Sequence, residues 1–326
     1  MRYTVLGRTG LRVSSLCLGT AWFGVAPPAA DVGALVGRAL DAGVNFFDTA
    51  STYGNQSRFD RPGQAASDAR ESAEELLGRA LRGHRDEVVL ATKVGERSGP
   101  GHNDVGVSRE HVERMVERSL RRLATDRVDI LYVHHPDPGT GMAELATTFD
   151  RLIGRGLIRH WGLSNFTAEQ TMELHETARR HSLEPPVVQQ LQYNLARRSA
   201  ERDLLPTVAR YESAAIAYAG LAGGLLGGSA AARRRFSGAA RIGRAAHSPA
   251  QLAVADGLQR LADAKGEQPG RLALGWLLSR PGVVATVVGP ESAEEFSGLV
   301  RDLDDSLPRE LLTEIDALTQ PFTDLS

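Results

Sequence analysis

The sequence predicts an α/β protein, a (β/α)8 TIM barrel with an N-terminal β-hairpin and additional C-terminal helices, formed by residues 1–326 as a single domain. Eight short apolar runs rich in β-branched residues alternate with amphipathic helical patterns. This unit repeats within ~300 residues, a usual size for such a barrel, and no linker rich in Pro or Ser divides the chain. The alternative is a doubly wound sheet, but LGTAWFG and not GxGxxG follows the first run, which favours the barrel.

The elements follow in order along the chain. YTVL and LRVS, joined by the turn GRTG, predict the hairpin. The eight strand-like runs span 15–19, 45–48, 88–93, 130–134, 158–164, 187–190, 214–218 and 284–289. Helical patterns span 31–43, 71–81, 108–123, 143–156, 167–181, 201–211, 271–280 and 292–303, with further helices at 251–265 and 308–319. Ser108 and Thr167 are good helix starts.

Two long loops, 54–69 and 222–247, follow strand ends. In a barrel both lie on the face where active sites form. The first is expected to set substrate choice and not coenzyme affinity. The other interpretation is that they are disordered insertions, and for 228–245 both interpretations stay open.

Composition narrows the classes of protein. The chain has 38 basic and 40 acidic residues and a formal net charge of −2, which argues against nucleic-acid binding. It has no apolar run of the ~18–20 residues needed to span a membrane and no apolar signal-peptide core at its N-terminus. Its one cysteine, Cys17, fits a reducing cytoplasm. We therefore expect a cytoplasmic protein with a small-molecule substrate.

Polar residues end three consecutive strand-like runs. Asp48, Lys93 and His134 each follow an apolar stretch, and Tyr53 lies in the loop after Asp48. Charges at such positions are costly unless they are paired or functional. A structural ion pair at Lys93, or a loop cap made by Asp48 and Tyr53, is the alternative. No metal is expected, because zinc needs three or four ligands and the sequence pairs no third residue with His134 and His135.

These residues carry a resemblance to a known family. FDTASTYG, ATKVG, DILYVHHPDP, GLSNF, QLQYNL and GLAGGLLGG resemble, in the same order, the motifs of the aldo-keto reductases. The resemblance implies NAD(P)H-dependent reduction of an aldehyde or ketone to an alcohol, with Asp48, Tyr53, Lys93 and His134 as the catalytic residues. Tyr53 would be the general acid, with its pKa lowered from ~10 by the Lys93 ammonium. His134 would polarise the substrate oxygen.

The resemblance also implies a coenzyme site. Ser164, Asn165 and Gln190 would hold the carboxamide, and Tyr218 would stack on the nicotinamide ring. For Tyr218 the alternative is a core aromatic, and for Ser164 and Asn165 it is a helix N-cap. Ala219 and Gly220 replace the Ser and Pro usual in the family. The whole set expected at the coenzyme is Thr20, Asp48, Ser164, Asn165, Gln190, Tyr218, Ala219, Gly220, Leu221, Gly223, Gly289, Ser292 and Glu295.

NADPH is the expected coenzyme, with NADH as the alternative. Glu291 and Glu295 fall where relatives place basic or amide side chains, and Glu294 adds a third acid. A carboxylate repels the 2′-phosphate of NADPH. The opposing feature is an arginine cluster in the loop 222–247, which could supply the missing positive charge. The cluster consists of Arg233, Arg234, Arg235, Arg241 and Arg244.

The substrate pocket is expected at Trp22, Phe23, Arg58 and His135, whereas Trp161 is interpreted as packing. SRPG, VVGP and QYNLARRS resemble the deoxysugar ketoreductases of antibiotic pathways, which implies a nucleotide-linked keto-deoxysugar. Three arginines of the loop 54–69 and its end would then meet the diphosphate, or else are solvated loop charges. They are Arg58, Arg61 and Arg70.

Two other functions stay open. One is a coenzyme-binding regulatory subunit with little turnover. The other is a redox-assisted isomerase or dehydratase on the same scaffold. The sequence is silent on oligomeric state and on the physiological direction of the reaction.

Overall fold

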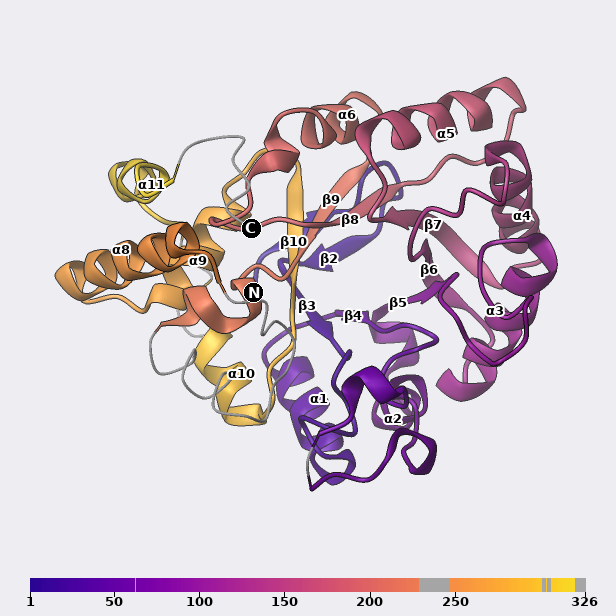
Figure 1. Cartoon of the computed structure of the whole chain (residues 1–326), viewed down its shortest axis with the longest axis horizontal. Coiled ribbons are helices and arrows are strands. Elements are labelled where there is room, and N and C mark those ends of the chain that lie inside the picture. The colour runs from indigo at the N-terminus through magenta and orange to yellow at the C-terminus, as the bar shows by residue number, and fades with distance from the viewer. Residues whose placement is uncertain (62, 229–246, 301–302, 304–305, 320–326) are drawn as a thin grey trace.

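The structure is a computed structural model and describes residues 1–61, 63–228, 247–300, 303 and 306–319. Eight parallel strands form a closed barrel in the order β10-β3-β4-β5-β6-β7-β8-β9, and helices surround it (Figure 1). The predicted (β/α)8 barrel is therefore confirmed. The single-domain organisation over the whole chain stays a prediction.

All eight predicted strand-like runs coincide with barrel strands. The strands are β3 (Leu16–Gly19), β4 (Phe46–Asp48), β5 (Val89–Val94), β6 (Val128–Val133), β7 (Ile158–Ser164), β8 (Val188–Gln192), β9 (Ala214–Tyr218) and β10 (Val283–Val288). Gly19 pairs with Asp48 and Asp48 pairs with Ala91, so the carboxyl ends of neighbouring strands meet at one edge.

The predicted hairpin is formed by β1 (Tyr3–Val5) and β2 (Arg12–Ser14), paired antiparallel. Its apolar residues Leu6 and Val13 are buried among Phe46, Val89 and Ile216 of the barrel strands. Because Phe46 and Val89 stand at or near the starts of their strands, the hairpin covers the end of the barrel opposite to the strands' carboxyl ends.

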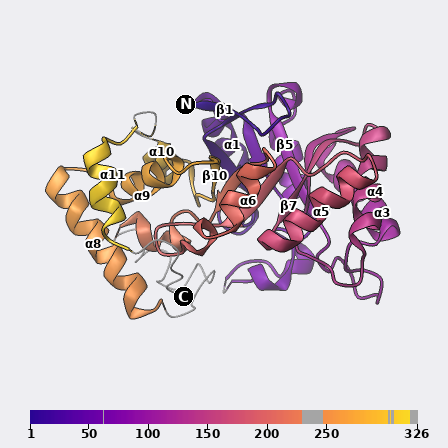
Figure 2. The ribbon, with the colours of Figure 1, turned by 90° about the horizontal axis from the view of Figure 1, so that it is seen from above.

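The predicted helices are present as well. They are α1 (Val32–Asp41), α2 (Ala73–Ala80), α3 (Arg109–Leu123), α4 (Met142–Gly154), α5 (Ala168–Arg180), α6 (Leu204–Arg210), α8 (Pro249–Lys265), α9 (Pro269–Leu278), α10 (Ala293–Val300) and α11 (Arg309–Asp316). Thr167 begins α5 with a capping box that includes Gln170. Ser108 stands at the N-cap of α3, but its side chain makes no capping hydrogen bond. Figure 2 shows the C-terminal helices α8 to α11 gathered on one side of the barrel.

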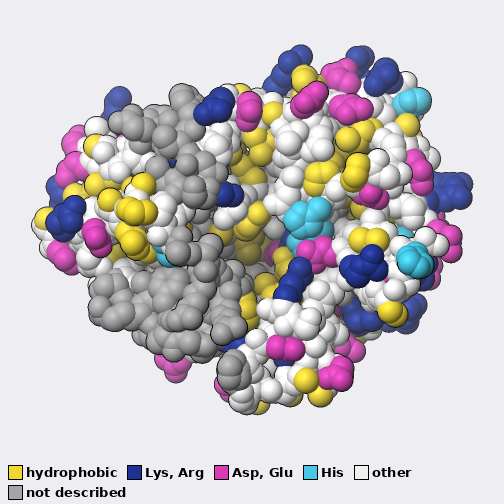
Figure 3. Space-filling model, viewed as in Figure 1, with side chains coloured by type: hydrophobic (Ala, Val, Ile, Leu, Met, Phe, Trp, Pro, Cys, Tyr) yellow, Lys and Arg dark blue, Asp and Glu magenta, His cyan; other side chains and the backbone are white. Residues whose placement is uncertain are grey.

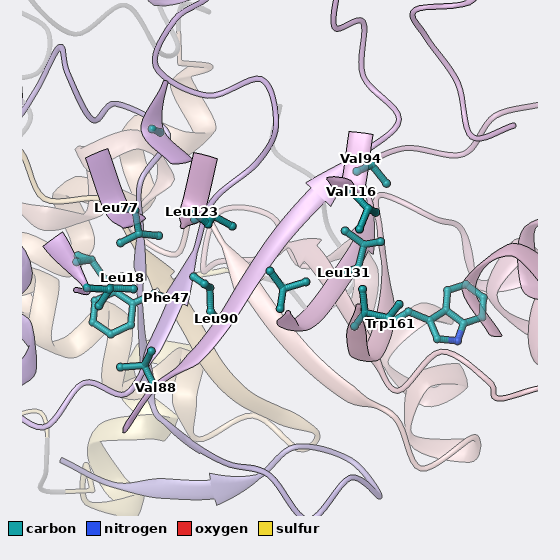
Figure 4. Close-up of a cluster of buried hydrophobic side chains, with 14 of the residues drawn as sticks. Leu18, Phe47, Leu77, Val88, Leu90, Val94, Val116, Leu123, Leu131 and Trp161 are labelled. Atoms are coloured by element: carbon teal, nitrogen blue, oxygen red, sulfur yellow. The ribbon is translucent and has the colours of Figure 1, made fainter. Parts of the chain in front are cut away.

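The main core lies between the strands and the helices around them. Leu18, Phe47 and Leu90 project outward from successive strands and meet Leu77 of α2 and Leu123 of α3 (Figure 4). This follows from the alternation of a strand, since outward positions face the helices and inward ones fill the barrel.

The interpretation of Trp161 as a packing residue is confirmed. Its indole is fully buried, stacks on Phe149 with ring centroids 4.8 Å apart, and donates a hydrogen bond of 2.9 Å to the carbonyl of Glu184. No helix in the described part of the chain is long and apolar enough to cross a membrane.

The two long loops differ in what the structure describes. The loop 54–69 is folded around two short 3-10 helices, η2 (Ser57–Phe59) and η3 (Ser67–Ala69), so the disordered interpretation is wrong for it. The loop 222–247 begins with η6 (Ala222–Gly227). The five arginines predicted to face NADPH lie in 229–246, outside the described residues.

Candidate active site

The structure brings the four residues predicted as catalytic together at the carboxyl end of the barrel. The Lys93 ammonium contacts the Asp48 carboxylate directly and donates a hydrogen bond of 3.0 Å to the carbonyl of Thr49. The Tyr53 hydroxyl lies 3.5 Å from Nε2 of His134. Lys93 Nζ is 4.9 Å from the centroid of the Tyr53 ring. Adjacent parallel strands thus place these side chains around one point.

Lys93 and Asp48 form a buried ion pair, with 1% and 2% of their residue surfaces exposed. Burial alone lowers the pKa of Lys93, but the contacts with Asp48 and Tyr53 together outweigh burial and raise that pKa above its ordinary value. Lys93 therefore stays charged beside Tyr53.

The pKa of Tyr53 is shifted in the direction opposite to the one expected. Loss of contact with water raises the pKa of Tyr53, and the Lys93 ammonium opposes this rise without overcoming it. The expectation of a pKa below the usual value is therefore wrong for this structure. A raised pKa keeps the phenol protonated at neutral pH, which a proton donor requires.

His134 is neutral in this environment. Burial lowers its pKa to about 3, and the nearby Lys93 ammonium adds to the effect. Its backbone carbonyl accepts a hydrogen bond of 2.9 Å from the Asn165 side chain, which ties the end of β6 to the end of β7.

The sequence analysis missed Glu96, just after β5. Its carboxylate accepts two hydrogen bonds from Arg58, at 3.0 and 2.6 Å, and a further one from the Thr52 hydroxyl. It lies 3.7 Å from Nδ1 of His134 and 3.5 Å from Nε2 of His135. Its place three residues after Lys93, in the loop above the same strand, is the only signal in the sequence.

Glu96 also corrects the expectation that no third residue accompanies the two histidines. The ligand-type atoms of Glu96, His134 and His135 lie within 4.8 Å of one another. Both carboxylate oxygens, however, are engaged by the Arg58 guanidinium. We therefore interpret the group as a hydrogen-bonded ionic network.

The predicted carboxamide-binding residues converge on the same point. Gln190 donates a hydrogen bond of 2.8 Å to the Asp48 oxygen that Lys93 leaves open. The Tyr218 hydroxyl donates to Oδ1 of Asn165 at 2.7 Å, and Nδ2 of Asn165 donates to the Ser164 hydroxyl at 3.1 Å. These contacts hold the amide and hydroxyl groups at the cavity edge.

Two alternative interpretations of this group are contradicted. The N-cap of α5 is Thr167, so Ser164 and Asn165 do not cap that helix. Tyr218 is only part-buried and lines the cavity, so it is not a core aromatic.

A cavity of about 500 Å³ opens above the four residues. Figure 3 shows the molecular face hollowed at its centre, with hydrophobic side chains inside and a cluster of histidine, acidic and basic side chains at the rim. Of the residues predicted for catalysis, coenzyme and substrate, it is lined by Thr20, Trp22, Phe23, Asp48, Tyr53, Arg58, His134, His135, Ser164, Asn165, Gln190, Tyr218, Ala219, Gly220, Leu221, Gly223 and Gly289. Lys93 lies beneath this surface.

A second cavity of about 560 Å³ shares Leu221, Gly224 and Leu299 with the first. It is lined further by Gly227, Gln268, Gly270, Arg271, Glu291, Ser292, Glu294, Glu295 and Gly298. The two cavities together form one long site. In the first, the Thr20 hydroxyl is buried without a hydrogen-bond partner within the described structure, so the site has polar capacity to offer a ligand.

Comparison with known proteins identifies the family. The aldo/keto reductase family model matches residues 15–320. The chain belongs to the aldo/keto reductase family. It is 35% identical to the uncharacterized oxidoreductase YrpG of Bacillus subtilis, over 96% of this chain and 94% of that protein. It is 30% identical to L-glyceraldehyde 3-phosphate reductase of Escherichia coli, over 93% of this chain and 88% of that protein. A probable voltage-gated potassium channel subunit beta of Oryza sativa is 33% identical, over 98% of this chain and 97% of that protein.

Membership of the aldo/keto reductases makes this chain an oxidoreductase. The family and the relatives named as oxidoreductase and reductase support NAD(P)H-dependent carbonyl reduction as its general chemistry. The two cavities are lined by amide, hydroxyl and aromatic side chains of the kinds that NAD(P)H binding requires.

The backbone after β9 is fixed by contacts within the protein. Ala219 has a φ of 55°, and its carbonyl accepts a hydrogen bond of 2.9 Å from the Asn194 side chain. A Cβ added at Gly220 would lie 2.8 Å from side-chain atoms of Leu277 and Thr286, so the Pro usual here in aldo/keto reductases does not fit without rearrangement. Gly220 thus suits this chain's own packing.

An aromatic wall borders the first cavity on the substrate side. Phe59, which the loop 54–69 carries beside Tyr53, packs edge-on against Trp22 with ring centroids 5.2 Å apart and against Tyr53 at 6.1 Å. Phe23 is buried behind it. This wall places the loop 54–69 against the predicted catalytic tyrosine.

The three arginines predicted to meet a diphosphate are engaged within the protein. Arg58 binds Glu96. Arg61 is buried over the Trp22 ring, 4.2 Å from its centroid, with Nη2 3.6 Å from a carboxylate oxygen of Glu291. The interpretation as a solvated loop charge is therefore wrong for Arg61, whereas Arg58, with 44% of its side chain exposed, lines the cavity.

Arg70 organises the loop from inside. Only 4% of its side chain is exposed, and it pairs with Asp60 at 2.9 Å. It donates hydrogen bonds to the carbonyls of Gly54, Gln56 and Ala65. Arg70 is a structural residue of the loop 54–69.

The predicted coenzyme residues after β10 form a helix cap. The Glu295 amide donates to the Ser292 hydroxyl at 3.1 Å, and the Glu291 amide donates to the Glu295 carboxylate at 2.7 Å. Glu295 thus places a carboxylate at the N-terminus of α10, where it interacts favourably with the helix dipole. Both residues line the second cavity and not the first.

Proposed function

We propose that the protein reduces the carbonyl group of a small molecule to an alcohol with NAD(P)H and that Tyr53 donates the proton. The observation that carries this proposal is the meeting of a protonated Tyr53 with the buried Lys93–Asp48 pair and neutral His134 beneath one cavity. Reduction requires a hydride at carbon and a proton at oxygen. The coenzyme supplies the hydride when it is bound.

The chain's own residues supply binding, orientation and the proton. Ser164, Asn165 and Gln190 offer donors and acceptors to a carboxamide, and Tyr218 offers an aromatic face beside them. Thr20 adds its hydroxyl at the same end of the cavity. In this arrangement the reacting carbonyl lies next to the Tyr53 hydroxyl.

Lys93 and Asp48 assist the proton transfer from Tyr53. When Tyr53 gives up its proton, the phenolate that forms is stabilised by the adjacent ammonium, which Asp48 keeps charged and in place. His134, whose Nε2 lies 3.5 Å from the Tyr53 hydroxyl, helps to orient the substrate oxygen. In alcohol oxidation the same Tyr53 oxygen accepts the proton.

A Tyr53→Phe variant tests the proposal. It removes the proton donor and leaves the ring packed on Phe59, so turnover should fall by ~10²–10⁴ while the dissociation constant of the dinucleotide stays within about twofold. The matched control is Tyr193→Phe, which removes a buried hydroxyl bonded to Glu201 outside the cavity. That variant should lose stability and keep turnover. Reduction by Tyr53→Phe at the wild-type rate would refute the assignment.

NADPH is the coenzyme that we propose, and NADH is the alternative. The described residues that line the second cavity include three carboxylates, those of Glu291, Glu294 and Glu295, and a single guanidinium, that of Arg271. The Arg271 guanidinium is paired with Glu267 at 2.7 Å. The Arg61 contact offsets part of the charge of Glu291. The proposal rests on family precedent and on the arginines of 229–246, so a comparison of both coenzymes is essential.

The finer substrate prediction is less well supported. None of the relatives named above carries the name of a deoxysugar ketoreductase, and the arginines expected at a diphosphate have other contacts. The L-glyceraldehyde 3-phosphate reductases instead bring a small phosphorylated aldehyde into consideration. A nucleotide-linked keto-deoxysugar and a cytoplasmic location stay predictions.

A regulatory subunit is the second candidate function. Relatives named as potassium channel beta subunits align with nearly the whole chain at 31–33% identity. Coenzyme binding without steady-state turnover of any aldehyde or ketone would favour this function. A product with unchanged oxidation state would favour the isomerase or dehydratase alternative.

A further inference from the structure

The rim of the first cavity carries a closed ionic network made of Arg58, Glu96, His135 and Thr52. The Arg58 guanidinium binds both Glu96 oxygens, and the Thr52 hydroxyl donates to one of them. Nη2 of Arg58 also donates a hydrogen bond of 3.2 Å to the Thr52 hydroxyl oxygen. His135 approaches the other Glu96 oxygen at 3.5 Å. Arg58, Glu96 and His135 therefore each contact another member of this network.

Glu96 is ionised in this network. Burial would raise its pKa, but contacts with His135, Arg58 and Thr52 outweigh burial and hold the pKa well below its usual value. Only 16% of the Glu96 side chain is exposed, whereas 44% of Arg58 is exposed. The carboxylate is thus the inner charge of the pair and the guanidinium the outer one.

Among the described residues, the remaining charges at this cavity give an anion no partner. Within the described structure, Arg58 is the only Lys or Arg among the lining residues, while Asp48 and Glu96 are both carboxylates. Arg61 and Arg70 of the same loop are turned to Glu291 and Asp60. A phosphate on the substrate would approach Glu96 and would have to compete with it for Arg58.

The pocket also has an apolar side, which adjoins the ionic network because the Arg58 guanidinium lies over the Phe59 ring, 5.0 Å from its centroid. Trp22 and Phe59 form an aromatic wall, whereas His135, with half of its side chain exposed, offers hydrogen bonds at the rim. An uncharged molecule with hydroxyl groups and C–H faces satisfies both sides without breaking the ionic network.

We propose that Glu96 is a specificity-determining residue, which holds Arg58 and restricts the pocket to uncharged, hydroxylated carbonyl compounds in preference to phosphorylated ones. This inference rests on the proposed carbonyl reduction. It assigns this chain a substrate class different from the one in the name of its L-glyceraldehyde 3-phosphate reductase relatives.

The kinetic test compares glyceraldehyde with L-glyceraldehyde 3-phosphate. Wild-type protein should show at least about tenfold higher kcat/KM for glyceraldehyde, and Glu96→Gln should shift this ratio toward the phosphorylated aldehyde by about tenfold. The ratio cancels any effect that Glu96 has on the chemistry through His134. A wild-type preference for the phosphorylated aldehyde, or an unchanged ratio in Glu96→Gln, overturns the proposal.

Glu71→Gln is the matched control. Glu71 binds Arg79 through both oxygens, at 2.6 and 3.0 Å, but on the exposed surface and outside the cavity. It makes the same change in net charge and breaks the same type of ion pair. The substrate ratio should not change in this variant, and a shift equal to that of Glu96→Gln would refute a local effect.

A binding experiment separates this inference from the proposed function. Glycerol and glycerol 3-phosphate, which carry no carbonyl, are titrated into the protein with coenzyme bound. Glu96→Gln should bind glycerol 3-phosphate about tenfold more tightly than wild type and glycerol equally well. Equal affinity of both proteins for glycerol 3-phosphate overturns the inference. The expected binding result without turnover of either aldehyde counts against the proposed function alone.

Discussion

Nε2 of Gln190 donates a hydrogen bond of 2.8 Å to the Asp48 carboxylate, across 142 positions of the sequence. The other oxygen of that carboxylate holds the Lys93 ammonium. An amide predicted for the coenzyme therefore also fixes the ion pair beside Tyr53. The groups expected to bind the coenzyme and to transfer the proton therefore share one buried carboxylate.

Gln190→Met should lower both dinucleotide affinity and kcat, each by about tenfold, because a hydrogen bond to a buried charge is lost at the same time as a carboxamide contact. Fluorescence titration with NADPH and steady-state kinetics measure the two effects. The control is Gln189→Met, since the Gln189 side chain points away and donates to the Phe166 carbonyl. A fall in affinity with no change in kcat would mean that Gln190 does not support Asp48.

Arg61→Met tests the expectation that the loop 54–69 serves the substrate alone. Arg61 stacks on Trp22 of the substrate wall and also reaches Glu291 of the second cavity. The variant should raise the KM of the substrate, and it should weaken NADPH severalfold because Glu291 loses a cation. Gln64→Ala, an exposed change in the same loop, is the control. An unchanged dissociation constant for NADPH would restore the original expectation.

Glu294→Gln should favour NADPH. Glu294 is exposed at the start of α10 and lines the second cavity, so its carboxylate adds to the repulsion of a 2′-phosphate. The variant should bind NADPH about two- to fivefold more tightly and NADH as before, with the gain shrinking at high salt. Calorimetric titrations of both coenzymes at low and high salt measure this. The same gain for NADH would show that the carboxylate does not face the 2′-phosphate.

Acid should destabilise the fold through His134. Its pKa is about 3 in the folded protein and ~6.5 when unfolded, so the unfolded chain binds a proton first as the pH falls. The stability that neutral His134 contributes is therefore present above pH ~6.5 and is lost between there and pH ~3. The free energy of unfolding, measured with urea, should change less steeply with pH in His134→Gln than in wild type, by up to about 1.4 kcal/mol per pH unit. The exposed His102→Gln is the control, and equal slopes for wild type and His134→Gln would contradict the prediction.

The sequence by itself determined the barrel and the positions of the main polar groups. The eight apolar runs alternate with helical patterns, and in a parallel barrel the residues that end the strands must meet at one edge. For that reason Asp48, Lys93 and His134 could be assigned to one site from the pattern of strands, whereas Ser164, Gln190 and Tyr218 were assigned to it by resemblance to the family. The positions of these side chains in the barrel depend on local periodicity and on strand direction, and both can be read from the sequence.

The tertiary structure alone decided how the loops use their charges. Glu96 meets Arg58, and Arg61 meets Glu291, across loops that leave different strands, and no periodicity records which loop side chains pair. The net pKa of Tyr53 likewise depends on how strongly burial opposes the Lys93 ammonium, and burial is a property of the packed molecule. The sequence placed the reacting groups, and contacts between distant loops set the charge that a substrate meets.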